Sequence, residues 1–199
     1  MLNQFSRTQL LFGPEAMEIL WGSRVAVFGI GGVGGYAVEA LARSGIGTLD
    51  LIDDDRVCLT NLNRQIIALH STVGRPKVDV AAERIHDICP ETEVVEYPVN
   101  YTAENKDLID FASYDYIVDA IDMVTSKILL IEEAKKVLNA EFPELAAKIR
   151  STGAKLLLCG TPDACESLMI PRHKNGFFAE RSAAQRVADA NKISGELAA

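Results

Sequence analysis

Three glycines at a fixed spacing follow the first apolar run of the chain. The run Arg24–Phe28 leads into Gly29, Gly31 and Gly34, which form the pattern G-x-G-x-x-G, and a helical pattern follows at once. The first glycine permits a tight turn, the second lets the backbone approach a phosphate, and the third lets helix and strand pack closely. With the N–H groups of a helix amino end beside it, this turn predicts a nucleotide-phosphate site. A glycine turn that serves only packing is the alternative.

The second apolar run ends in three carboxylates, "LIDDD". Asp53 lies nineteen positions after Gly34, where a carboxylate can accept hydrogen bonds from ribose hydroxyls. This spacing alone would favour an NAD-dependent dehydrogenase.

Two cations and a further carboxylate favour ATP over NAD. Arg64 in "NLNRQ" and Lys77 in "GRPK" leave the same carboxyl edge of the predicted sheet, and Asp122 in "DAID" follows the fourth apolar run. A triphosphate carries more charge than a dinucleotide, and its transfer commonly requires cationic side chains and a metal ion. Asp122 is a suitable Mg²⁺ ligand or, alternatively, a helix N-cap. Arg64 and Lys77 could also be solvated surface cations.

Apolar runs that alternate with helical patterns must position these groups. The runs are Arg24–Gly29, Thr48–Asp53, Glu93–Val99 and Tyr114–Asp119. Their alternation with helices predicts an α/β fold with a doubly wound, mostly parallel sheet and a Rossmann-like ATP-binding half.

Three helices are predicted between and after these runs. In the helix after the glycine turn, the predicted buried face is Val33, Ala37, Ala40, Leu41 and Ser44. In the helix over Lys77–Cys89, it is Val78, Ala81, Ala82, Ile85 and Ile88. A third helix is expected from Ser126 to about Asn139, and a helix, a strand at "AKLLLCG" and a last helix are expected after Glu141.

The bulk composition is that of an ordinary globular protein. The 199 residues are 48% hydrophobic and carry a net charge of −8, which disfavours a surface wholly devoted to nucleic acid. No signal peptide or membrane-spanning run is present, so a cytoplasmic location is expected. The four cysteines contain no C-x-x-C pair, so neither a zinc site nor a disulfide framework is expected. We expect a single domain over residues 1–199.

The combination of "GIGGVGG", "LIDDD", "NLNRQ", "GRPK" and "DAID" resembles the superfamily of ubiquitin-activating-enzyme-like (ThiF-like) adenylyltransferases. Within it, "FSRTQLLFG", "NLNRQIIALHSTVGRPKV" and "KILLIEEAKK" look most like the tRNA threonylcarbamoyladenosine dehydratases. The resemblance runs from about Asn3 to Lys136, roughly two thirds of the chain.

The resemblance implies a role for each motif. The residues that would line the phosphates are Gly29, Gly31, Gly32 and Gly34. Asp53 would hold the ribose. The remaining nucleotide contacts would be Asp55, Asn61, Arg64, Gln65 and Lys77. Asp122 would bind Mg²⁺, and Arg7 would reach the ATP site of the partner subunit, which implies a homodimer. A surface cation on a helix is the alternative for Arg7.

The implied reaction is adenylation of a carboxylate by ATP. The substrate would be the threonyl carboxylate of a modified adenosine in tRNA, and ring closure by a nitrogen of the same modification would lose water overall. Activation of the carboxyl end of a ubiquitin-like sulfur carrier, and a nucleotide-binding scaffold without catalysis, are the alternatives. An NAD-linked redox enzyme is the weakest reading.

Beyond Lys136 the sequence departs from the pattern of the family, so residues 137–199 are treated as divergent. The expected C-P-L-A-R motif is missing there. Cys159 and Cys165 match the family cysteine by residue type alone. His173 and Lys174 could form a small basic site for RNA, although an exposed loop is the better account of them.

Overall fold

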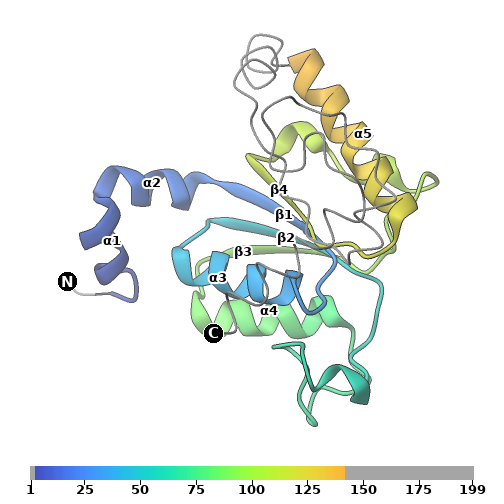
Figure 1. Cartoon of the computed structure of the whole chain (residues 1–199). Coiled ribbons are helices and arrows are strands. Elements are labelled where there is room, and N and C mark those ends of the chain that lie inside the picture. Colours follow the sequence, from blue (N-terminus) through green and yellow to red (C-terminus); the bar gives the residue numbers. More distant parts are fainter. Residues whose placement is uncertain (1–2, 142–199) are drawn as a thin grey trace, which may run out of the picture. The chain divides into compact units, whose positions relative to one another are not determined.

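Each of the four apolar runs forms a strand of one parallel sheet in the computed structural model, which describes residues 3–141. The strands are β1 (Arg24–Phe28), β2 (Thr48–Ile52), β3 (Glu93–Tyr97) and β4 (Tyr116–Asp119), in the order β3-β2-β1-β4. This is the arrangement of the first four strands, 3-2-1-4, in the six-strand order of a dinucleotide-binding fold. The predicted α/β class with a parallel sheet is therefore confirmed (Figure 1).

The register of the sheet brings the carboxyl ends of three strands together. Phe28, the last residue of β1, pairs with Ile52 of β2 and with Asp119 of β4. The segments that leave these strands therefore start side by side, and they carry the glycine turn, the carboxylate run and the residues after Asp119. A ligand site is expected at this edge in such sheets.

The chain divides into two compact units, residues 1–121 and 122–199, and each is described by itself. The second unit contributes α5 (Val124–Glu141), which contains the helix expected from Ser126 to Asn139. The other elements expected after Glu141 lie outside the described residues. The single domain over residues 1–199 stays a prediction.

Two helices of the first unit cover one face of the sheet. They are α3 (Gly34–Ser44), which packs on β1 and β4, and α4 (Lys77–Ile88), which packs on β2 and β3. The buried residues of this layer include Val25, Val27, Leu49 and Leu51 from the sheet and Val78, Ala81, Ala82 and Ile85 from α4. The predicted buried face of α4 is thus confirmed, with Ile88 partly buried at its end.

The predicted buried face of α3 is wrong. Val33 is 50% exposed and Ala40 is exposed, whereas Gly34, Gly35, Val38 and Ala42 are buried. The physical reason is that α3 approaches the sheet through its glycines, so backbone fills positions where the hydrophobic pattern expects side chains. The helix ends at Gly45, which is left-handed at φ 86°.

The opposite face of the sheet carries an aromatic cluster and a buried ion pair. Phe28 packs on Tyr101 and Phe111 with ring centroids 5.1 and 6.1 Å away. Asp50, which is fully buried, accepts hydrogen bonds from the guanidinium of Arg24 and from the hydroxyl of Tyr114. Polar and aromatic contacts thus contribute to the packing of this face.

Two short helices precede the sheet and were not predicted. They are α1 (Ser6–Phe12) and α2 (Pro14–Gly22), and neither contains a buried residue. Just before α1, Phe5 is buried against Gly45 and meets Trp21 edge to face. This contact anchors the pair to the end of α3.

The connection between β2 and α4 is long and is held by its own hydrogen bonds. It contains the 3-10 helix η1 (Leu59–Asn61). An isolated antiparallel bridge between Arg56, near its start, and Pro76, at its end, closes it. Two further 3-10 helices, η2 (Lys106–Leu108) and η3 (Phe111–Ser113), lie between β3 and β4. Among residues 3–141, no helix combines the length and apolar content needed to cross a membrane.

Candidate nucleotide site

Two glycines of the turn are required by the backbone itself. Gly29 has φ +86°, and a Cβ built on it would lie 2.6 Å from the carbonyl oxygen of Ala120. A Cβ built on Gly34 would lie 1.7 Å from the carbonyl oxygen of Gly29. Neither position tolerates a side chain, because the contacting atoms are backbone that cannot move aside. These two glycines bring the start of α3 against the end of β1.

The other two glycines of the turn are not crowded by their neighbours. A Cβ on Gly31 would meet only the Nε2 atom of Gln65 at 3.8 Å, and a Cβ on Gly32 would meet the Cγ of Arg64 at 3.7 Å as its nearest neighbour. Both are ordinary van der Waals distances, and neither glycine needs a left-handed backbone. The half-buried Gly31 and Gly32 thus lie beside the Gln65 amide and the aliphatic part of the Arg64 side chain, with no atom close enough to exclude a side chain.

Asp53 ties the glycine turn to the end of β2. Its Oδ2 accepts a hydrogen bond from the backbone N–H of Ile30 at 2.6 Å, and its Oδ1 accepts one from the N–H of Asp55 at 2.9 Å. The side chain is only 7% exposed. Burial raises the pKa of this carboxyl above its usual value, although the two N–H groups and the charge of Lys77 oppose the shift. Oδ1 keeps a second lone pair, so a ribose hydroxyl can still donate to it.

Lys77, the first residue of α4, lies between two carboxylates. Its Nζ is 2.7 Å from the Oδ2 of Asp55 and 3.5 Å from the Oδ2 of Asp53. The lysine side chain is 5% exposed, whereas that of Asp55 is 68% exposed. Its buried ammonium is thus held at the carboxylate run, with one counter-ion inside the protein and one facing water.

Carboxylate oxygens of Asp53, Asp54 and Asp55 lie within 4.8 Å of one another, a grouping that could suit a cation. The Lys77 ammonium already contacts two of the three. We therefore treat the group as a lysine site rather than a metal centre.

The three polar residues of "NLNRQ" lie in and after η1. Asn61 is buried, and its Oδ1 accepts from the backbone N–H of Cys58 at 2.9 Å, which closes the start of η1. Arg64 is exposed, and its Nη1 donates to the carbonyl of Thr60 at 2.9 Å. Gln65 is 6% exposed, and its Oε1 is buried without a hydrogen-bond partner among the described residues. An unpaired buried polar atom is unfavourable, so the Gln65 amide has unused capacity beside Gly31.

The structure brings one set of predicted site residues together within the first unit. The glycine turn is contacted by Asp53, Arg64 and Gln65, and Asp53 is in turn contacted by Lys77 and Asp55. The contact of Asp55 with Lys77 was not predicted, because the two residues lie at the two ends of a long connection and no local pattern joins them.

For other predicted residues a place at this site stays a prediction. Arg7 is exposed on α1. Asp122 is the first residue of the second unit, three positions after β4 ends, and its place beside the glycine turn stays a prediction. The predictions for Cys159, Cys165, His173 and Lys174 concern residues outside the described part of the chain. Of the described cysteines, Cys58 is an exposed thiol and Cys89 a buried one.

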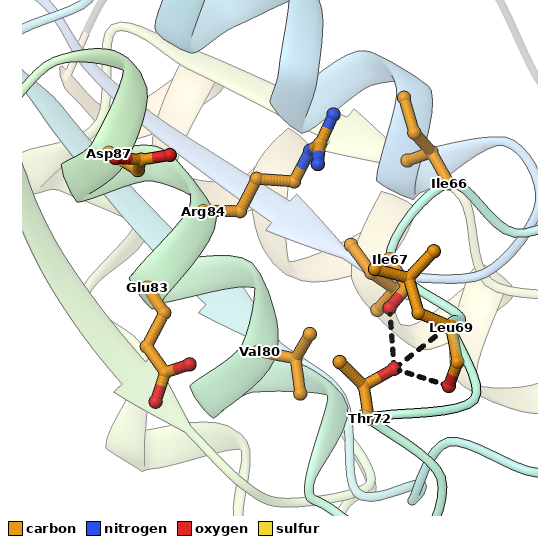
Figure 2. Close-up of a pocket in the computed structure, with 8 residues that line it drawn as sticks. All are labelled: Ile66, Ile67, Leu69, Thr72, Val80, Glu83, Arg84 and Asp87. Atoms are coloured by element: carbon orange, nitrogen blue, oxygen red, sulfur yellow. Dashed lines mark hydrogen bonds between the residues drawn. The ribbon is translucent and has the colours of Figure 1, made fainter.

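A separate pocket of about 310 Å³ lies between α4 and residues 66–72 of the long connection (Figure 2). Its wall includes Ile66, Val80 and Arg84, and the guanidinium of Arg84 is hydrogen-bonded to Glu39 of α3. None of the predicted nucleotide contacts lines it. It is therefore distinct from the open face of the glycine turn.

Comparison with known proteins agrees with this geometry. Residues 5–157 match the model of the ThiF family, which extends past Lys136, where the quoted motifs end. The tRNA threonylcarbamoyladenosine dehydratase of Bacillus subtilis (strain 168) is 51% identical over 136 residues, covering 68% of this chain and 54% of the relative. The sulfur carrier protein adenylyltransferase of Thermus thermophilus is 36% identical over 135 residues, covering 67% and 49%.

A solved structure supports the same relationship. The E. coli tRNA N6-threonylcarbamoyladenosine dehydratase TcdA, in complex with ATP, matches with a TM-score of 0.63 and 43% identity, covering 67% of this chain and 55% of that chain. The chain thus spans about half the length of the curated relatives it matches. Because the family model covers more than half of its residues, the chain belongs to the ThiF family.

Proposed function

We propose that this protein binds ATP on the glycine turn and adenylates a carboxylate. The observation that carries the proposal is the turn at Gly31 and Gly32, where an added Cβ would meet only the Gln65 amide and Arg64 at ordinary contact distances. Backbone N–H groups at a helix amino end suit phosphate oxygens, and the Arg64 guanidinium, which donates to the carbonyl of Thr60 in this structure, would turn toward them.

The residues present fit a nucleotide. The Gln65 amide is buried and has an unpartnered oxygen, and its nitrogen lies at Gly31, so the amide can both donate to and accept from a bound group. Asp53 keeps a free lone pair on its Oδ1 for a ribose hydroxyl. Asn61, whose Oδ1 caps η1, would present the other end of its amide to the phosphates.

The chemistry of the proposed reaction follows from charge. A carboxylate is a poor electrophile because it is anionic and its oxygen leaves badly. Attack of the carboxylate oxygen on the α-phosphorus of ATP forms a new O–P bond and breaks the bond to pyrophosphate, and the product is an acyl-adenylate. Arg64 and Lys77 would stabilise the negative charge that gathers on the departing pyrophosphate.

A divalent cation is part of this proposal. Asp122 would hold Mg²⁺, an ion that prefers carboxylate and phosphate oxygens. When bound, the ion would neutralise phosphate charge during transfer. Asp122 follows β4, whose carboxyl end lies next to that of β1 in the sheet.

For the substrate we propose the carboxylate of threonylcarbamoyladenosine in tRNA, which would be cyclised with loss of water. The support is the name of the relative that is 51% identical. Relatives that are named as adenylyltransferases of sulfur carrier proteins support a protein carboxyl terminus as the second candidate. ATP and tRNA as substrates would place the protein in the cytoplasm.

We also propose a homodimer in which Arg7 enters the ATP site of the partner subunit. Arg7 lies on α1, a helix with no buried residue, where Leu10, Leu11 and Phe12 are 89%, 79% and 61% exposed. So large an apolar set on one short helix is typical of a surface that is covered by another chain.

The test is exchange of labelled pyrophosphate into ATP. The assay is run with tRNA that carries the modified adenosine, with tRNA that lacks it, and with a sulfur carrier protein. Exchange only with modified tRNA supports the proposal. Exchange only with the carrier protein supports the second candidate, and ATP binding without exchange in any arm supports a scaffold.

A further inference from the structure

We infer that Asp55 is a positioning residue that holds the Lys77 ammonium in place for pyrophosphate departure. The inference rests on the proposed function, because it gives Lys77 its role toward phosphate. It concerns a side chain that does not touch the glycine turn in the described structure.

Three contacts connect Asp55 to the groups around it. Its Oδ2 lies 2.7 Å from the Nζ of Lys77, its carbonyl accepts the backbone N–H of Lys77 at 2.9 Å, and its own N–H donates to Asp53 at 2.9 Å. Asp55 therefore binds both ends of the lysine residue, and it links the lysine to the carboxylate that orders the glycine turn.

The two counter-ions of Lys77 differ in strength. The distance of 2.7 Å to Asp55 is that of a short charge-assisted hydrogen bond, whereas the distance of 3.5 Å to Asp53 is at the outer limit of one. Asp53 also accepts hydrogen bonds from two backbone N–H groups, so its carboxylate interacts less strongly with Lys77 than that of Asp55 does. The direction of the Lys77 ammonium is thus set mainly by Asp55.

A lysine side chain has four rotatable bonds, and the ammonium acts as a point charge. Its contribution to a transition state depends on where that charge is held when pyrophosphate leaves. Removing the holder should therefore lower the maximal rate more than it changes the affinity for ATP, because ATP keeps its contacts with the glycine turn and Arg64 in the ground state.

Asp54 provides a matched control. It is exposed, directly precedes Asp55 and carries the same charge, yet it has no hydrogen bond or ion pair to Lys77. Asp54→Asn and Asp55→Asn thus remove one negative charge each from neighbouring positions. Only the second removes a contact with the ammonium, and neither alters the backbone hydrogen bonds.

The first measurement is the pyrophosphate exchange rate of the full-length chain against ATP concentration. For Asp55→Asn we expect the maximal rate to fall about 10-fold, with the KM for ATP within about two-fold of the wild type. Asp54→Asn should leave both values unchanged, and Asp55→Glu should recover most of the rate because it restores the carboxylate. A change in KM alone, an equal loss in Asp54→Asn, or no recovery in Asp55→Glu would overturn the inference.

The second measurement does not depend on catalysis. The rate at which acetic anhydride modifies Lys77 is followed by mass spectrometry of the peptide, and thermal unfolding checks that each variant is folded. We expect modification of Lys77 to become several-fold faster in Asp55→Asn and to stay unchanged in Asp54→Asn. If the wild type shows no pyrophosphate exchange, the proposed function fails, but the modification rates still show whether Asp55 holds the Lys77 ammonium. Equal modification of Lys77 in all three proteins would refute the positioning role.

Discussion

The carboxylate of Asp53 accepts a hydrogen bond from the backbone N–H of Ile30 at 2.6 Å, so the end of β2 orders the turn that follows β1. Ile30 lies between Gly29 and Gly31. An acidic side chain that sequence alone assigns to a ribose thus also supports the backbone that would receive the phosphates. Binding and local structure are coupled through a single buried carboxylate.

This coupling predicts a pH dependence of stability for Asp53→Asn. Burial raises the pKa of Asp53 in the folded protein, so in the unfolded chain the carboxyl loses its proton first as the pH rises. The free energy of unfolding of the wild type relative to Asp53→Asn should therefore fall with rising pH, over a window that begins near the ordinary aspartate value of about 3.9. Urea unfolding of both proteins at several pH values measures this. A relative stability that increases with pH would show that the hydrogen bonds outweigh burial.

The glycines of the turn should separate into two classes on substitution by alanine. At Gly34 the new Cβ would collide with backbone, so Gly34→Ala should unfold the turn and destabilise the protein by several kcal/mol, about 3 or more. At Gly31 and Gly32 the space is open, so Gly31→Ala and Gly32→Ala should change the free energy of unfolding by less than about 1 kcal/mol. Both should nevertheless weaken ATP binding at least 10-fold, because a methyl group would occupy the phosphate position.

Calorimetric titration with ATP and denaturant unfolding measure the two effects separately. If Gly31→Ala and Gly32→Ala bind ATP as the wild type does, the nucleotide does not lie on this turn.

Arg64→Ala should slow pyrophosphate exchange by about two orders of magnitude, by analogy with the loss of one donor to a transition state. Arg56→Ala is the control, because Arg56 is an exposed arginine of the same connection whose Nη1 donates to the carbonyl of Gly74 instead. It should keep the wild-type exchange rate. An unchanged rate in Arg64→Ala, or an equal loss in both variants, would remove the role assigned to Arg64.

The sheet and the glycine turn were predictable because they depend on local patterns. Apolar runs fix the strands, and the G-x-G-x-x-G spacing fixes the start of α3. The boundaries differ from prediction by one or two residues; the fourth run was expected from Tyr114, for example, whereas β4 begins at Tyr116.

Contacts between residues far apart in the chain could not be predicted from the sequence. The buried face of α3 was assigned wrongly because the pattern counts side chains, whereas Gly34 and Gly35 pack through their backbone. The helices α1 and α2 were missed because neither buries a side chain, so no stripe marks them. Residues that flank a loop, such as Asp55 and Lys77, meet only when the connection of residues 56–76 folds back, and no spacing rule encodes that.

The buried ion pair on the second face of the sheet gives a last prediction. Asp50 is fully buried, and its carboxylate accepts two hydrogen bonds from Arg24 and one from Tyr114. This carboxylate raises the pKa of the Arg24 guanidinium, and burial together with Asp50 raises that of the Tyr114 hydroxyl. Asp50→Ala should lower the free energy of unfolding by about 3 kcal/mol, the lower end for a broken buried pair, since Arg24 is 35% exposed and can turn to water.

Tyr114→Phe removes one hydrogen bond of the same network and should lower the free energy of unfolding by about 1 kcal/mol. Asp115→Ala is the control, because Asp115 accepts the backbone N–H of Arg24 at an exposed position; it should stay within about 0.5 to 1 kcal/mol of the wild type. Denaturant unfolding of the three variants provides the comparison. If Asp50→Ala were no less stable than Asp115→Ala, the hydrogen bonds of the Asp50 carboxylate would only offset the cost of burying its charge. The contacts of Phe28 with its aromatic neighbours would then contribute more to the stability of this face than the ion pair does.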